Sequence, residues 1–164
     1  MSSLTLKLEG DAVVVVTRRF EATPEFVFRA HTEPELIQRW MLGPDGWSMP
    51  ECEYEARPGG GIRYEWRNEQ GHRIFLTGEC LEVQPFTRLV HVERLFLPDR
   101  TPDKYVETTF EADGAGTLLT ARMTLPDAAS RAAMISTGIE QGIEASYDRL
   151  EGLIQSREAS VIPA

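Results

Sequence analysis

Apolar and polar residues alternate through the middle of the chain. Residues 62–67 read Ile-Arg-Tyr-Glu-Trp-Arg, the strict alternation of an antiparallel strand with one buried face, so Tyr64 and Trp66 are expected to point inward. Similar runs predict four more strands, over residues 74–83, 88–97, 105–111 and 117–125. Short turns rich in glycine, proline and asparagine separate them, which favours a meander because parallel neighbours need long crossovers.

A strand and two short helices are expected ahead of this meander. Residues 12–20 are rich in valine and predict the first strand. Thr23 followed by Pro24 is typical of a helix start, with the threonine as N-cap and the proline in the first turn. Thr32 and Glu35 have the spacing of a capping box, which predicts the start of a second helix.

Residues 127–157 predict one long C-terminal helix. Its apolar stripe is formed, at helical spacing, by Ile135, Ile139, Gly142, Ser146, Leu150 and Leu153. Its polar side carries Arg131, Glu140, Glu144, Asp148 and Glu151. Gly138 and Gly142 each cost roughly 1 kcal/mol in a helix interior, which favours a role in close packing or in leaving room. Gly142 is expected to face the sheet and a cavity, whereas Gly138, at the edge of the stripe, is expected to be more tolerant of substitution.

Charge and composition narrow the class of protein. The pattern predicts a single α+β domain over residues 1–164, with a core from 12 to 157 and tails at 1–4 and 158–164. The net charge of -9 disfavours nucleic-acid binding. No stretch offers the roughly 18 apolar residues of a membrane span. Charged residues from Lys7 to Asp11 interrupt any signal peptide, and two isolated cysteines make no disulfide framework, so a cytoplasmic protein is expected.

No metal or cofactor is expected. His31, His72 and His91 lie on three different elements, and none has a neighbour at metal-ligand spacing. The glycine-rich residues 57–61 lack the Lys-Ser/Thr pair of a phosphate-binding loop and predict a hairpin turn instead. No nucleophile motif surrounds a serine or a cysteine.

Several segments occur in an order that is typical of one family. They are Arg-Phe-Glu-Ala-Thr-Pro-Glu-Phe-Val-Phe at 19–28, Thr-Glu-Pro-Glu-Leu at 32–36 with Trp40, Arg-Pro-Gly-Gly at 57–60, Gly-Glu at 78–79 with Leu-Glu-Val at 81–83, Arg-Leu-Val-His-Val-Glu-Arg at 88–94, and Ser-Tyr-Asp-Arg-Leu at 146–150. Together they resemble domains homologous to the activator of heat-shock protein 90 ATPase, over residues 12–155. The resemblance implies the helix-grip fold of the START and birch-pollen-allergen (SRPBCC) superfamily. In that fold a curved antiparallel sheet wraps around a long C-terminal helix and encloses a mostly apolar cavity.

The resemblance suggests where a ligand would bind. Four aromatic residues, Trp40, Trp47, Tyr64 and Trp66, either pack in the core or line the cavity and stack on a ligand. The full set of candidate ligand-binding residues is Trp40, Trp47, Tyr64, Trp66, His91, Glu93, Met123, Met134, Gly138 and Gly142.

His91 and Glu93 are the candidate catalytic residues, on one face of the strand at 88–97. In relatives the position that matches Glu93 often holds a cavity-facing tryptophan, so this face is expected to lie inside. Burial would raise the pKa of Glu93 towards the range of acid or base chemistry. The alternatives are a buried Glu93 paired with an arginine such as Arg122, or an exposed one on the outer face.

Three functions are compatible with these residues. The first is binding of a small hydrophobic or aromatic molecule, such as a lipid, by a monomer or homodimer. The second is a cyclase or hydrolase that uses Glu93 and His91, with Tyr64 as an orienting donor. The third is a co-chaperone-like interaction protein. Eukaryotic activators carry an additional N-terminal domain for which this chain has no room, so a chaperone partner is not expected.

Overall fold

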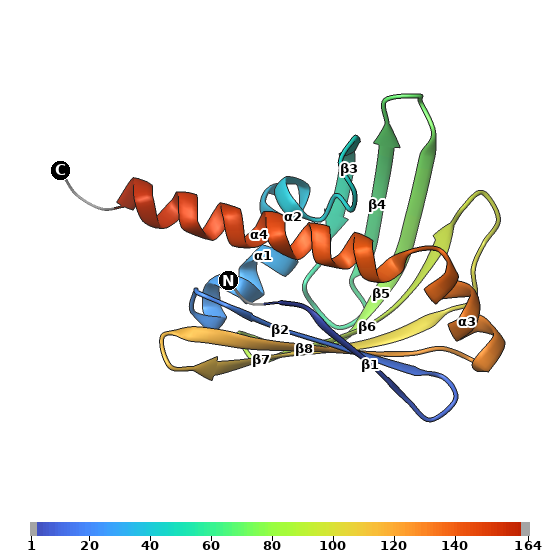
Figure 1. Ribbon diagram of the computed structural model, residues 1–164, viewed down its shortest axis with the longest axis horizontal. Helices are drawn as coiled ribbons and strands as arrows, with labels where there is room; N and C mark the ends of the chain where they lie inside the picture. Colours follow the sequence, from blue (N-terminus) through green and yellow to red (C-terminus); the bar gives the residue numbers. More distant parts are fainter. Residues whose placement is uncertain (1–2, 162–164) are drawn as a thin grey trace.

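The computed structural model describes residues 3–161, with side chains up to residue 157, as one curved sheet and four helices (Figure 1). The strands are β1 (Thr5–Glu9), β2 (Val13–Phe20), β3 (Trp47–Tyr54), β4 (Gly61–Asn68), β5 (Arg73–Gln84), β6 (Arg88–Phe96), β7 (Lys104–Asp113) and β8 (Gly116–Thr124). The helices are α1 (Pro24–Thr32), α2 (Pro34–Trp40), α3 (Ala128–Ser136) and α4 (Ile139–Val161).

The sheet is antiparallel throughout and has the order β1-β2-β8-β7-β6-β5-β4-β3. Strands β4 to β8 form the expected meander, β3 adds a further strand at its edge, and β2 returns to pair with β8. The helix α4 crosses the concave side of this sheet, with α1 and α2 beside it (Figure 1). The α+β helix-grip prediction is therefore confirmed.

Two strands differ from the prediction. Residues 5–9 form β1, which pairs with β2 from Thr5 opposite Thr17 to Glu9 opposite Val13. Trp47, expected in a loop, is the first residue of β3 and lies opposite Asn68. Both are edge strands: β1 has only five residues with two leucines, and β3 contains Pro50, Glu51 and Glu53, so neither has the longer apolar alternation of the central strands.

The two short helices begin in different ways. The Thr23 hydroxyl accepts a hydrogen bond from the Phe26 amide at 3.3 Å, as an N-cap should. Thr32 does not cap α2, and the predicted capping box is wrong. Its buried hydroxyl instead donates to the Phe28 carbonyl at 3.2 Å, so Thr32 belongs to α1. Glu33 takes the N-cap position, because Pro34 holds the residue before it in an extended conformation.

The C-terminal segment is two helices, which corrects the prediction of one. Asp127 caps α3 by accepting a hydrogen bond from the Ser130 amide at 2.7 Å. The chain then turns at Gly138, whose φ of +82° lies in the left-handed region that side chains disfavour. Because the helical phase restarts there, Ile135 is exposed and no residue of α3 is buried.

The buried side of α4 is therefore shifted from the predicted stripe. Leu150 is buried as expected, and Ser146 is buried where its hydroxyl accepts a hydrogen bond from the Gly43 amide at 2.8 Å. Tyr147, Ile154 and Glu151 are also buried, although Glu151 is expected on the polar side. Tyr147, Leu150 and Ile154 belong to one core cluster with residues of β2, β7 and β8, which are Val14, Val16, Val106, Phe110, Leu119, Ala121 and Met123.

A buried arginine fastens α4 to this surface. The Arg18 side chain on β2 is fully buried, and its Nη1 donates to the Asp148 carboxylate at 2.7 Å. Asp148 is about half exposed, so water reaches its carboxylate but not the buried Arg18 guanidinium.

Substitutions of Gly138 and Gly142 test whether the chain turns at Gly138 between α3 and α4. Gly138→Ala should lower the free energy of unfolding by about 1–2 kcal/mol, because alanine is strained in the left-handed region. Gly142→Ala should raise it by up to about 1 kcal/mol through helix propensity, since the nearest atom to an added Cβ is Pro44 Cδ at 4.0 Å. Urea denaturation measures both. A Gly138→Ala protein as stable as Gly142→Ala would contradict the turn.

Candidate functional site

Three polar side chains meet on the concave face near one end of the sheet. The register places Glu93 of β6 opposite Lys104 of β7, and His91 lies two residues from Glu93 on the same face. Leu89 on this face is buried, and the Glu93 side chain is only 15% exposed, so the face expected inside does lie inside.

Glu93 uses both of its oxygens within this cluster. Its Oε1 lies 2.6 Å from His91 Nε2, and its Oε2 lies 3.1 Å from Lys104 Nζ. The expected arginine partner is elsewhere, because Arg122 pairs with Glu9 at 2.8 Å. Lys104 is thus the cation that neutralises Glu93.

The cluster determines the charge of Glu93. Burial by itself raises the pKa of this carboxyl, but attraction to Lys104 and hydrogen bonds from His91 and Lys104 outweigh it and hold the pKa at about 2. The expectation of a raised pKa is therefore wrong, and Glu93 is a carboxylate at neutral pH. Since a carboxylate only accepts, His91 Nε2 carries the shared hydrogen. His91 Nδ1 is buried and has no hydrogen-bond partner among the described residues.

A pocket of about 340 Å³ lies beside this cluster. We call it the α3 pocket, because α3 and the first residue of α4 form one wall and the ends of β6, β7 and β8 form the other. Its lining is mostly apolar and comprises Leu95, Leu97, Pro102, Leu125, Ala129, Ala133, Met134 and Ile139, with Glu93, Arg94, Thr101, Lys104, Ser130 and Thr137. Lys104 Nζ lies 3.8 Å from the Met134 sulfur, so the ammonium group bridges the two walls.

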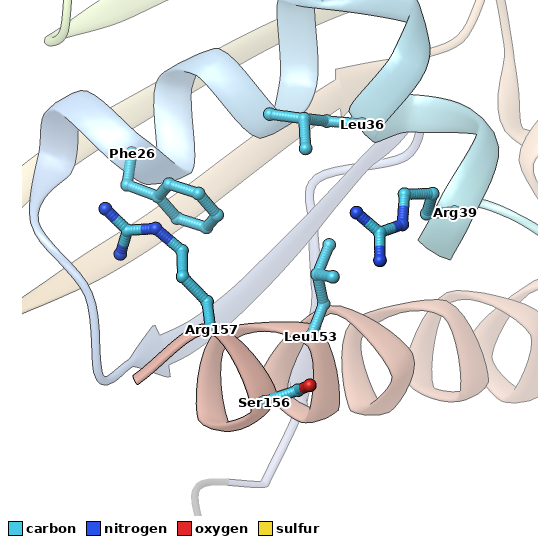
Figure 2. A pocket seen from close by; sticks show the side chains of 6 residues that line it. All are labelled: Phe26, Leu36, Arg39, Leu153, Ser156 and Arg157. Carbon is cyan, nitrogen blue, oxygen red and sulfur yellow. The ribbon is translucent and has the colours of Figure 1, made fainter. Parts of the chain in front are cut away.

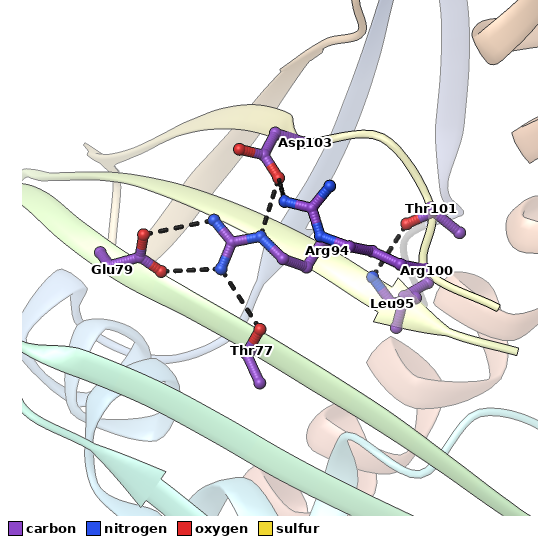
Figure 3. Close-up of polar contacts among 7 residues, drawn as sticks. All are labelled: Thr77, Glu79, Arg94, Leu95, Arg100, Thr101 and Asp103. Atoms are coloured by element: carbon purple, nitrogen blue, oxygen red, sulfur yellow. Dashed lines mark hydrogen bonds and ion pairs between the residues drawn. The ribbon is translucent and has the colours of Figure 1, made fainter. Parts of the chain in front are cut away.

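The β6–β7 loop forms the rim of the pocket and is held by a polar network (Figure 3). The Arg94 guanidinium contacts Asp103 at 2.7 Å and Glu79 at 2.8 Å. The Thr101 hydroxyl accepts a hydrogen bond from the Leu95 amide at 2.9 Å. The rim is therefore fixed by the sheet rather than by the helices.

The wall formed by α3 is attached differently. Arg131 Nη1 donates to the carbonyl oxygens of Glu9, Gly10 and Val13 at 3.0–3.1 Å, which ties α3 to the β1–β2 turn. Because α3 buries no residue, it is attached by this arginine, by the partly buried Met134 that packs against the core, and by the short turn at Gly138.

None of the four aromatic candidates is among the residues that line the α3 pocket. Trp40 is buried, stacks on Tyr147 with ring centroids 5.7 Å apart, and donates to the Ala30 carbonyl at 2.9 Å. Trp66 donates to the Met41 carbonyl at 2.8 Å and contacts Tyr64 edge-on. These rings pack as parts of two core clusters.

Of the other candidates, Glu93 and Met134 line the pocket, and His91 contacts Glu93 from behind. Met123 is buried in the core beneath α4, Gly138 forms the turn, and Gly142 lies against Pro44. Trp47 is half-buried at the start of β3.

Lys104 is not among the candidate residues predicted from the sequence. It is one of only two lysines in the chain, and the first residue of a strand paired with the Glu93 strand. That combination of a rare cation and a cross-strand glutamate was the available signal.

The remaining histidines do not extend the site. His31 lies among aromatic rings, where burial lowers its pKa to about 4, and His72 is exposed in the β4–β5 turn beside Asn68. Within residues 3–161, no three His, Cys, Asp or Glu side chains are grouped as a metal site requires.

A second hollow of about 240 Å³ lies between α1, α2 and the end of α4 (Figure 2). Leu36 and Leu153 form its floor, and the guanidinium groups of Arg39 and Arg157 flank it. Arg157 stacks on the Phe26 ring at 4.2 Å. Both arginines of this second hollow are exposed, so neither is a desolvated polar group that could orient a ligand. The α3 pocket is therefore the better candidate.

Comparisons with known proteins agree with this fold. A protein from Rhodobacter sphaeroides is 26% identical, with a TM-score of 0.88, over 94% of this chain and 99% of the other. Proteins from Nitrosomonas europaea (22% identical, TM-score 0.81, 93% and 99% covered) and Mycobacterium smegmatis (18%, 0.81, 92% and 96%) share the fold. No functionally curated protein matches the chain. In the part of the chain that the structure describes, no helix has the length and hydropathy to span a bilayer.

The family described as "Activator of Hsp90 ATPase homolog 1-like protein" matches residues 21–155. This match covers most of the chain and includes both walls of the α3 pocket. The chain therefore belongs to the family of proteins like the activator of Hsp90 ATPase homologue 1.

Proposed function

We propose that this protein binds a small, mostly apolar molecule in the α3 pocket. The observation that carries the proposal is a hollow of about 340 Å³ whose apolar walls end on the Glu93–Lys104 ion pair. Small-molecule sites combine these features, an apolar lining with a few polar groups that orient the ligand. The volume is at the lower end of the usual range, roughly 300–1,000 Å³, so the ligand is small.

The attachment of α3 supports entry of a ligand on this side. A helix without buried residues can be displaced at little cost in hydrophobic free energy. The sheet wall and the rim stay in place, because the Arg94 network does not involve α3. A cytoplasmic location and the lack of a nucleic-acid or chaperone partner stay predictions from the sequence.

A second candidate function is proton abstraction by His91. In the neutral form of His91, the Nε2 hydrogen bonded to Glu93 leaves a lone pair on Nδ1, which is the arrangement of an oriented general base. Nδ1 is buried behind the pocket and does not line it, so a substrate would need a rearrangement to reach it. Binding is therefore the function that we favour.

Two neighbouring alanines on α3 test the binding site. Both alanines are exposed, but Ala133 lines the pocket and Ala132 does not. Ala133→Phe should fill the pocket and weaken binding of the neutral fluorophore N-phenyl-1-naphthylamine by at least about tenfold, or about 1.4 kcal/mol. Ala132→Phe should bind it like the wild type. Fluorescence titration measures the affinities, and thermal melting checks the folds. Equal binding by both variants, or none by the wild type, would contradict the site.

The protonation state of Glu93 tests whether this residue can act as a general acid, because only a protonated carboxyl can donate a proton. Glu93→Gln should lower the free energy of unfolding by about 3 kcal/mol at neutral pH, the equivalent of a pKa lowered from 4.5 to about 2. Because the folded pKa is the lower one, this stabilisation is complete above about pH 4.5 and disappears as the pH falls towards 2. The difference between the two proteins should shrink over that window.

Urea denaturation between about pH 7 and pH 3 measures this difference. Glu53→Gln, at an exposed position of β3, is the control and should change little at any pH. If the difference had already closed at pH 6, Glu93 would be protonated in the native protein, and a role as general acid would be open again.

A further inference from the structure

We propose that the α3 pocket selects uncharged molecules with a hydrogen-bond acceptor, such as aromatic ketones, over the corresponding carboxylates. This inference rests on the proposed binding function and adds to it the chemical class of the ligand.

The free hydrogen-bonding groups at the polar end of the pocket decide which groups of a ligand can bind there. Both Glu93 oxygens are occupied, one by His91 and the other by Lys104. Lys104 has three N–H groups, of which Glu93 takes one and the Met134 sulfur makes a long contact with another. Within this cluster, Lys104 therefore offers a ligand a free N–H donor. A carbonyl oxygen matches it.

The other polar groups of the lining are less suited to hold a ligand. The Thr137 hydroxyl donates to the Met134 carbonyl at 2.6 Å, and the Thr101 hydroxyl accepts a hydrogen bond from the Leu95 amide, so the O–H that it has left is an uncharged donor. The Arg94 guanidinium is bound by Glu79 and Asp103 (Figure 3). Lys104 is thus the charged donor that a ligand can use, and hydrogen bonds from charged donors are the stronger ones.

The net charge of the Glu93–Lys104 pair also affects which ligands can bind. Lys104 and Glu93 neutralise each other, and their side chains are only 10% and 15% exposed. An uncharged ketone leaves this balance unchanged. A carboxylate would add a negative charge beside Glu93 in a poorly solvated site, and Arg94, the other cation of the lining, is already paired with Glu79 and Asp103. The pair therefore favours the ketone and disfavours the anion.

Three naphthalenes of similar shape test the selection by displacement of N-phenyl-1-naphthylamine at neutral pH. They are 2-acetylnaphthalene (a ketone), 2-naphthoate (an anion) and 2-isopropenylnaphthalene (without an acceptor). The wild type should bind the ketone at least about tenfold more tightly than the anion, or about 1.4 kcal/mol, and several-fold more tightly than the hydrocarbon. Equal or tighter binding of the anion by the wild type would overturn the proposal.

Two substitutions assign the selection to the ion pair. Lys104→Met removes the donor, so the ketone should lose its advantage over the hydrocarbon. Glu93→Gln leaves the Lys104 charge without its partner, so 2-naphthoate should gain about tenfold and lose most of its disadvantage against the ketone. Circular dichroism restricts the comparison to folded proteins. An unchanged preference in either folded variant would overturn the assignment.

The outcomes separate this inference from the binding function. If all three compounds bind with the same affinity and Ala133→Phe blocks them, the pocket binds ligands but the selection is wrong. If the wild type binds neither the fluorophore nor any naphthalene, the binding function itself is wrong.

Discussion

The left-handed turn at Gly138 is the constraint on which the candidate site depends. A continuous helix from Asp127 would have run past the end of the sheet, with Ile135 on its apolar stripe. The positive φ at Gly138 interrupts it, so that α3 lies at an angle to α4 and covers the ends of β6, β7 and β8 (Figure 1). Because α3 reaches this surface without burying a residue, a hollow remains between them. The pocket is thus a consequence of backbone geometry at one residue.

The polarity of that hollow is determined by a cross-strand pair. Antiparallel register alone brings Glu93 next to Lys104 on the concave face. Since the pair is neutral as a whole, it can be buried next to apolar side chains without an uncompensated charge. It also fixes the protonation of Glu93, which disfavours acid catalysis by this residue and leaves Lys104 as the group that faces a ligand.

The fold could be predicted from the sequence to a large extent. Alternation predicted the five strands β4 to β8 within two residues at each end, because their inner faces are apolar and their outer faces are charged. The edge strand β1 was missed because its leucines are only half-buried or exposed. The break at Gly138 was missed because helical periodicity continues across it, and only the backbone conformation reveals it.

The candidate site was predictable only in part. Glu93 and Met134 were candidates, and they line the pocket. Lys104 was missed because its position depends on the register between β6 and β7, which alternation does not give when a loop of irregular length joins the strands. The tryptophans were candidates, but they do not line the pocket. Large aromatic rings suit a core and a cavity equally well, and Trp40 and Trp66 use their indole N–H groups for backbone carbonyls.

We propose that the ligand lies against α3 and not among the aromatic rings of the core, such as Trp40 and Trp66. Two methionines distinguish these places, because Met134 lines the α3 pocket, whereas Met41 packs between the two core clusters beside Trp66. The direct measurement is NMR of protein labelled with ¹³C at the methionine methyl groups, with N-phenyl-1-naphthylamine bound. We predict intermolecular NOEs to the Met134 methyl group and none to Met41. NOEs to Met41, with none to Met134, would contradict the account.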